Sequence, residues 1–305
     1  MGIQALIEHS ARSYLAAGGA IDFSTPPGEP ALAGPDSVSW QVFRNPVGLF
    51  VGGVAAVILE LAEPRVREGV WTHSSFRDQP AERLRRTGMA AMVTVYGARS
   101  VAERMTAGIA QVHAGVSGTT PLGASYRASD PELLTWVHAT AAFGFLSAFT
   151  TLVQPLGPDR CDAFYAEGVP AGRLYGVPAP PASQAEAQAC LAAMRTRLEP
   201  SPILFEFLDI MRTAPILPPG ARLLQNMLVR AAVSLLPVWA RERLRLDAHW
   251  SLRGREARLL RTAARLAQRL RLDSSPASQA CVRLGLPPDH LQAVWAGRPR
   301  QNSAR

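Results

Sequence analysis

The amino-acid sequence predicts an all-α protein that folds as a single compact domain of many helices. Apolar residues recur with the helical period almost throughout, and no segment sustains the period-two alternation of a half-buried strand. The chain has 305 residues and is 48% hydrophobic, which is enough to bury one large core. No segment repeats at a fixed period, so one body of about ten helices is the simplest expectation.

Glycine, proline and capping residues divide the first half of the chain. Residues 18–46 are rich in Gly, Pro and Ser and are expected to form an ordered loop. The apolar helix after it should end before Pro64, because the residue preceding a proline disfavours helical backbone. Ser100 with Glu103 has capping-box spacing and predicts a helix that stops at Gly115. The expected helices here are residues 2–17, 46–62, 81–97 and 100–113.

The second half has clearer start signals. Asp130 followed by Pro131 indicates an N-cap with proline at the first helical position. Pro158 opens a further helix that should end near Gly168, and Ser183 begins an alanine-rich one. The expected helices are residues 131–153, 158–168, 183–198, 202–212, 219–236, 238–246, 251–272 and 276–284.

We expect three parts that share one body. Residues 1–45 form an N-terminal helix and ordered loop, and residues 46–250 form the helical core. Residues 251–305 form a basic amphipathic helix and tail packed on that core.

The positive charge belongs to the C-terminal part. All 32 basic residues are arginine, and the formal net charge is +8. Residues 241–305 hold 14 arginines against 5 acids, whereas residues 1–240 hold 18 against 19. The absence of lysine excludes a lysine Schiff base, a lysine general base and a Walker-type phosphate lysine.

Other chemistries are excluded because their spacings are missing. The sequence contains no HExxH, no Glu-x-x-His pair, no GxSxG and no strand followed by GxGxxG. The three cysteines lie far apart, which indicates neither a disulfide framework nor a zinc site. The histidines are scattered, so a metal would be held inside a cofactor rather than by a protein cluster. They are His9, His73, His113, His138, His249 and His290.

Two apolar segments raise the question of membrane insertion. Val47–Leu59 is too short to span a bilayer, and Leu133–Val153 is long enough but only moderately hydrophobic. We expect the second to be a buried central helix rather than a transmembrane one. No basic and apolar leader opens the sequence, which favours a cytoplasmic location.

His113 and His138 stand out because both lie in apolar helical segments. Each is compatible with a core histidine satisfied by one hydrogen bond, which is the commoner case. The alternative is an axial haem ligand in an apolar slot, with arginines for the propionates. The turn from Arg83 to Arg86 has the composition for this second role, although it is equally compatible with a solvated helix face.

Five motifs in a fixed order carry a family resemblance. They are Val70-Trp71-Thr72-His73-Ser74-Ser75-Phe76-Arg77-Asp78, Arg83-x-x-x-Thr87, Val112-His113-x-x-Val116-x-Gly118, Tyr126-x-Ala128-x-Asp130-Pro131 and Trp136-Val137-His138-Ala139-Thr140. Together they resemble the family that joins the rubber oxygenases (latex-clearing proteins) with the ER-bound oxygenase of mycophenolic acid biosynthesis. The resemblance covers roughly residues 40–250 and makes the core oxygenase-like.

This resemblance implies a globin-like core holding haem b, dioxygen as co-substrate and a hydrophobic, isoprenoid-like substrate cleaved at a C=C bond. It implies that His113 is the iron ligand and that Arg83 and Thr87 are catalytic. It also implies that Arg83, Arg86 and His138 help to bind the cofactor, His138 in a supporting role.

The sequence departs from the family at two points. Arg86 stands where the latex-clearing proteins have a lysine able to cap the iron, and arginine does not ligate iron because it stays protonated. The family's distal carboxylate is not clearly matched, and Glu60, Glu63 and Glu68 are all candidates by position.

The C-terminal helix over residues 251–272 is predicted to be amphipathic. Its basic stripe is Arg258, Arg261, Arg265 and Arg269, and its apolar stripe is Leu259, Ala263, Leu266 and Leu270. A packing helix with a solvated arginine face is one interpretation, and peripheral contact with an anionic membrane is another. No specific nucleic-acid contact is expected, because the helix lacks aromatic residues for stacking. For the whole chain, the alternatives to an oxygenase are a haem-free ligand- or partner-binding protein of the same fold and a membrane-peripheral protein.

Overall fold

The computed structural model describes residues 21–217 and 220–295, and there it is almost entirely helical. The helix expected over residues 2–17 lies outside these residues. In chain order the elements are α2 (Val38–Val42), α3 (Pro46–Ala62), α4 (Pro64–His73), α5 (Pro80–Tyr96), α6 (Arg99–Ala114), β1 (Ser117–Thr119), β2 (Ser125–Arg127), α7 (Pro131–Leu152), α8 (Pro158–Leu174), α9 (Gln184–Met194), α10 (Pro202–Thr213), α11 (Arg222–Leu235), α12 (Val238–Arg243), the 3-10 helix η1 (Ala248–Trp250), α13 (Gly254–Arg269), α14 (Pro276–Arg283) and α15 (His290–Trp295). The predicted all-α single domain is confirmed. Its globin-like core and its three-part division stay predictions.

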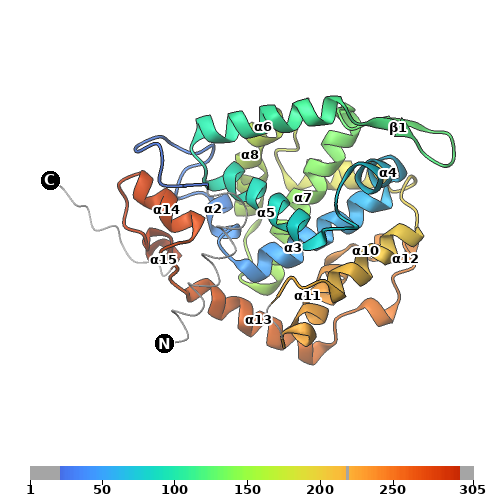
Figure 1. Cartoon of the computed structure of the whole chain (residues 1–305). Coiled ribbons are helices and arrows are strands. Elements are labelled where there is room, and N and C mark those ends of the chain that lie inside the picture. Colours follow the sequence, from blue (N-terminus) through green and yellow to red (C-terminus); the bar gives the residue numbers. More distant parts are fainter. Residues whose placement is uncertain (1–20, 218–219, 296–305) are drawn as a thin grey trace.

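The centre of the fold is the pair α3 and α7 (Figure 1). Their backbones touch where Gly52 meets Gly144: a Cβ added at Gly144 would lie 2.3 Å from the carbonyl oxygen of Gly52. Only glycine on both helices permits this approach. On α7, Trp136 and Phe149 are fully buried. By length and composition alone, α7 would also pass as a membrane span, as would α3 and α4 taken together, although those two are bent by 109°.

The structure adds helix α4, which the sequence reading missed. Pro64 ends α3 but also occupies the first turn of α4, where a missing N–H costs nothing. Glu63 caps the new helix, its carboxylate accepting the backbone N–H of Val66 at 2.9 Å. Pro64 therefore both ends α3 and begins α4.

The predicted capping box at Ser100 is wrong. Ala98 is the N-cap of α6, and it makes no side-chain capping bond. The N–H and the hydroxyl of Ser100 both donate to the carboxylate of Glu29, from a loop 71 residues earlier. A distant carboxylate thus satisfies the helix start in place of a local hydroxyl.

Helix α8 runs past Gly168, where it was expected to end, and continues through Pro170. Its glycines face the ring of His138 on α7. A Cβ at Gly172 would lie 3.0 Å from the imidazole Cε1 and 2.7 Å from Pro180. The glycines therefore serve close packing inside the helix rather than ending it.

The short hairpin of β1 and β2 was also not expected, because three-residue strands are too short to show alternation. It pairs Gly118 with Tyr126, whose hydroxyl would be 2.6 Å from a Cβ at Gly118.

Helix α13 buries a different face from the one predicted. The buried residues are Leu260, Ala264 and Gln268, whereas Leu259 and Leu266 of the expected apolar stripe are 59% and 56% exposed. The amide of Asn45 donates to the carbonyl of Ala264 at 2.8 Å and to Gln268 Oε1 at 2.9 Å. Polar pairing with the start of α3 decides which side of α13 faces the core.

Candidate functional site

The predicted site residues Arg83 and His113 lie on two helix segments that contain no buried residue. Arg83 is in the first turns of α5, where residues 80–88 are all partly or fully exposed, and His113 is in the last turn of α6, where the same holds for residues 107–114. The other halves of both helices are anchored, for example by Val93 on α5 and Ala102 on α6. The segments that carry the site are therefore held at one end and loosely packed at the other.

Arg83 interacts electrostatically with Glu60 on one side and His113 on the other. Burial raises the pKa of the Glu60 carboxyl to about 7, against a hydrogen bond from Thr140 and the charge of Arg83, which both lower it. Burial also lowers the pKa of Arg83, an effect that Glu60 opposes. The charges of these residues are thus coupled across α3, α5 and α6.

His113 is kept as a neutral imidazole. Partial burial lowers its pKa below the ordinary value of 6.5, and the positive charge of Arg83 lowers it further. A neutral imidazole is the form that ligates a metal.

Thr140 ties the carboxylate to the central helix pair. Its fully buried hydroxyl lies 3.4 Å from Glu60 Oε1 and also bonds to the carbonyls of Trp136 and Val137 one turn earlier. The sequence showed Thr140 only as part of a motif and gave no sign of its contact with α3.

Glu60 is the candidate carboxylate whose charge acts on Arg83. Glu63 is engaged as the cap of α4 and in an ion pair with Arg65 at 2.7 Å. Glu68 lies 3.9 Å from the guanidinium of Arg67. Position in the sequence could not separate them, because the burial and the partners of each carboxyl depend on how the helices pack.

Arg86 and Thr87 lie one helical turn after Arg83 and are exposed, and the charge of Arg86 lowers the pKa of Arg83. The side chain of Arg86 is 61% exposed and pairs with Glu82 at 3.1 Å. The hydroxyl of Thr87 donates to the carbonyl of Arg83 at 2.9 Å, a common local bond of a threonine inside a helix. Their predicted roles in cofactor binding and catalysis stay predictions.

His138 lies against α8 rather than beside Arg83. Its ring packs on Gly172 and Pro180, and burial lowers its pKa to about 4, so it is neutral at pH 7. Within the described residues its ring makes no hydrogen bond to another group. This environment suits a packing residue, and the cofactor-binding role predicted for His138 stays a prediction.

The described part of the chain holds no group of three or more His, Cys, Asp or Glu able to bind a metal ion. The features around His113 instead fit a cofactor that brings its own metal. The imidazole of His113 lies on a partly exposed helix half, and the charge of Arg83 acts on it.

Two curated mycobacterial proteins, uncharacterized protein Mb2261 of Mycobacterium bovis and uncharacterized protein Rv2237 of Mycobacterium tuberculosis, are each 30% identical to the chain over 128 residues. That alignment covers 41% of this chain and 50% of each relative, so the chain spans about half the length of the curated relatives it matches. No solved structure matches the chain significantly.

The family whose pattern matches is described as ER-bound oxygenase mpaB/B'/rubber oxygenase, catalytic domain. The match extends over residues 40–269, from α2 through α13, and includes Glu60, Arg83 and His113. The chain therefore belongs to this family of oxygenases.

Proposed function

We propose that the protein is a haem b-dependent oxygenase that uses dioxygen to oxidise a hydrophobic, isoprenoid-like substrate, with cleavage of a C=C bond as the outcome. The observation that carries the proposal is the coupling of Glu60, Arg83 and His113 across three helices of an oxygenase domain.

His113 would ligate the iron, since its imidazole is neutral and half-buried. Arg83 and Arg86 would hold the anionic side groups of the cofactor, because guanidinium groups pair with carboxylates in two-pronged geometry. When bound, haem supplies the redox chemistry that activates dioxygen.

Glu60 would act as the proton-transfer group. With a pKa of about 7, its carboxyl is able both to accept and to release a proton near neutral pH. Thr140 holds one oxygen of this carboxyl, and the charge of Arg83 keeps the pKa from rising further. The apolar side chains of α3, α5 and α7 would bind the substrate by its surface and exclude water.

The test is the visible spectrum of the purified protein, expressed with haem supply and recorded oxidised and dithionite-reduced. We expect a Soret band that His113→Ala weakens or abolishes. His73→Ala is the matched control, because His73 also ends a helix and its Nε2 lies 3.4 Å from the hydroxyl of Tyr126. A colourless protein at full haem supply would contradict the proposal and favour a haem-free ligand- or partner-binding protein of the same fold.

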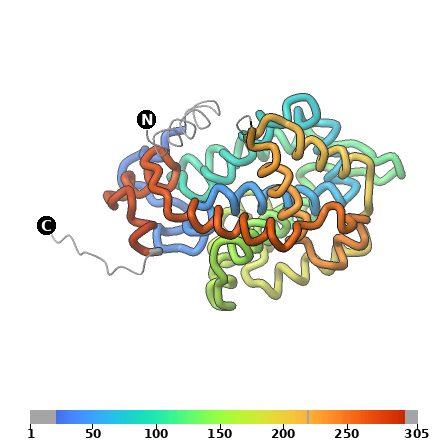
Figure 2. Tube along the Cα trace, turned by 90° about the horizontal axis from the view of Figure 1, so that it is seen from below, coloured from blue at the N-terminus to red at the C-terminus, as the bar shows by residue number. Residues whose placement is uncertain are grey.

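A second proposal concerns location: a cytoplasmic protein that touches anionic membranes through α13. Figure 2 shows α13 running along the surface of the molecule. Its outward face carries exposed leucines beside arginines that form no ion pair within the described residues. The leucines are Leu259, Leu266 and Leu270, and the arginines are Arg255, Arg258, Arg261, Arg265 and Arg269.

Apolar and basic residues on one exposed helix face are typical of interfacial binding. Co-sedimentation with anionic vesicles should be lost when Leu259 and Leu266 are both changed to serine. It should survive Val282→Ser, which alters an exposed residue of α14. Binding that ignores lipid charge would refute the electrostatic part.

A further inference from the structure

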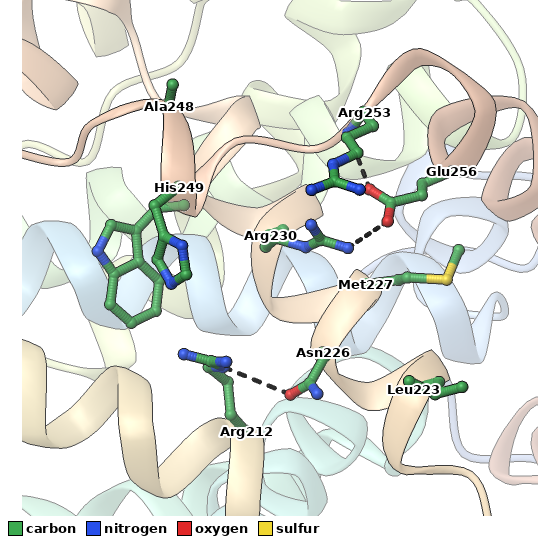
Figure 3. A pocket seen from close by; sticks show the side chains of 10 residues that line it. Arg212, Leu223, Asn226, Met227, Arg230, Ala248, His249, Arg253 and Glu256 are labelled. Atoms are coloured by element: carbon green, nitrogen blue, oxygen red, sulfur yellow. Dashed lines mark hydrogen bonds and ion pairs between the residues drawn. The ribbon is translucent and has the colours of Figure 1, made fainter.

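A pocket of about 440 Å³ lies between α10, α11, η1 and the start of α13 (Figure 3). In Figure 1 these elements occupy the side of the molecule opposite α6. The pocket is therefore separate from the site at His113, and an inference about it does not rest on the proposed function.

The lining of the pocket is strongly cationic. Arg212, Arg230 and Arg253 line it, with Glu256 as the one carboxylate among the lining residues, which leaves an excess of two positive charges. Figure 3 shows Arg212 reaching in from one wall and Arg230 and Arg253 from the opposite wall. Asp209 is 3.7 Å from Arg212, but it does not line the pocket and is 68% exposed.

The guanidinium of Arg212 is held in place before any ligand arrives. It stacks over the ring of Trp250 at 5.4 Å, and its Nε donates to Oδ1 of Asn226 at 3.4 Å. The ring of His249 packs edge-on against the ring of Trp250, with 5.5 Å between the ring centroids. A fixed guanidinium plane loses little conformational freedom when it binds an oxyanion.

On the opposite wall, the positive charge of Arg230 and Arg253 is partly neutralised by Glu256. Glu256 accepts a hydrogen bond from Arg230 and another from the backbone N–H of Arg253, at 2.9 Å. The side chain of Arg253 is exposed and forms no ion pair within the described chain. It is therefore the group most available to an incoming anion.

An apolar edge adjoins the charged interior. Leu223 and Met227 line the pocket from α11, and Leu223 is 79% exposed. An exposed leucine beside converging arginines suits a ligand with an anionic head and an apolar body.

We propose that this pocket binds a phosphate monoester whose apolar substituent lies against Leu223 and Met227. A phosphate monoester carries about two negative charges at neutral pH, which matches the excess charge of the lining, whereas a carboxylate would neutralise only half of it. Its oxygens accept from Arg212 and Arg253 in the two-pronged geometry that guanidinium groups favour. Both a soluble phosphate ester and a lipid with a phosphate monoester head have this chemistry.

The test is isothermal titration calorimetry of the full chain with hexyl phosphate, inorganic phosphate and hexanoate. We expect saturable binding of hexyl phosphate, tighter than that of either other probe. Arg253→Ala should weaken it about tenfold or more, since a charged hydrogen bond is lost, and Arg253→Lys should restore part of the affinity. Leu223→Ser should weaken hexyl phosphate but not inorganic phosphate.

Arg222→Ala is the matched control, because it removes the same charge from an exposed neighbour of Leu223 that does not line the pocket. Absence of saturable binding, or an equal loss in the control, would overturn the proposal. Titration with vesicles that contain phosphatidic acid separates the sources. Tighter binding there, sensitive to Arg253→Ala, assigns the site to a lipid head, and binding of hexyl phosphate alone assigns it to a soluble ester.

Discussion

The contact between Gly52 and Gly144 makes a sharp prediction about stability. In Gly144→Ala the new Cβ would lie 2.3 Å from the carbonyl oxygen of Gly52 and 3.2 Å from the backbone nitrogen of Ala56. Both neighbours are backbone atoms of a buried helix, so neither can rotate away. The first distance falls about 0.7 Å short of the 3.0 Å that real Cβ atoms keep, so α3 and α7 would have to separate.

The cost follows from this separation. Overpacking of a tight core costs about 1–3 kcal/mol, and here the upper end applies because the clash is with backbone. The better helix propensity of alanine returns up to about 1 kcal/mol. We expect a net loss of about 2 kcal/mol, seen as a melting temperature lower by roughly 3 °C in circular dichroism.

Gly108→Ala is the matched control on α6. It is the same substitution inside a helix, but nothing lies within 4 Å of the added Cβ. We expect it to stabilise the protein by about 0.5–1 kcal/mol. Equal melting temperatures for Gly144→Ala and the unmodified protein, or an equal loss in both variants, would refute the reasoning.

Three further predictions concern buried polar groups. Because the folded-state pKa of Glu60 is raised to about 7, its charge opposes folding, and stability should decline as pH rises from about 4.5 to 7. Glu60→Gln should remove most of that decline, roughly 3 kcal/mol at most, in urea unfolding at pH 5 and pH 8. Thr140→Val removes the hydrogen bond that lowers the Glu60 pKa, so the carboxyl should titrate at higher pH. Carbon-13 NMR of the Glu60 carboxyl measures this titration. An unchanged midpoint would contradict the hydrogen bond between Thr140 and Glu60. Gln268→Ala removes a buried acceptor that lies 2.9 Å from the Asn45 amide, and it should lower the free energy of unfolding by about 2–3 kcal/mol. Gln292→Ala, at a partly exposed site, is the control and should lower it by less than about 0.5 kcal/mol.

Helix existence was readable from the sequence wherever the signal was local. Asp130 before Pro131 predicts the start of α7, and the structure shows the Asp130 carboxylate accepting the N–H of Glu132. The apolar run after Pro46 likewise predicts α3 with its observed bounds. Caps and hydrophobic periodicity depend on residues within one or two helical turns. They can therefore be predicted from the sequence without the tertiary structure.

The helix boundaries and buried faces that the sequence misplaced depend on residues far apart in the chain. The start of α6 is satisfied by Glu29 from a distant loop, and α8 continues through Pro170 where its glycines pack on His138. On α13, the predicted stripe with Leu259 and Leu266 and the buried stripe with Leu260 and Ala264 both contain leucine, and Asn45 pairs with the buried one. No local rule distinguishes such cases, because the deciding contact comes from another element.

By itself the sequence determined an all-helical body, the absence of lysine chemistry, the basic C-terminal part and the motifs that place Arg83 and His113 in an oxygenase family. The tertiary structure decided which carboxylate Arg83 acts on. Glu60, Glu63 and Glu68 are chemically equivalent along the chain. In the fold Glu63 caps α4, whereas burial raises the pKa of Glu60 and the charge of Arg83 lowers it. Charge coupling and desolvation depend on distance through space, and folding alone sets those distances.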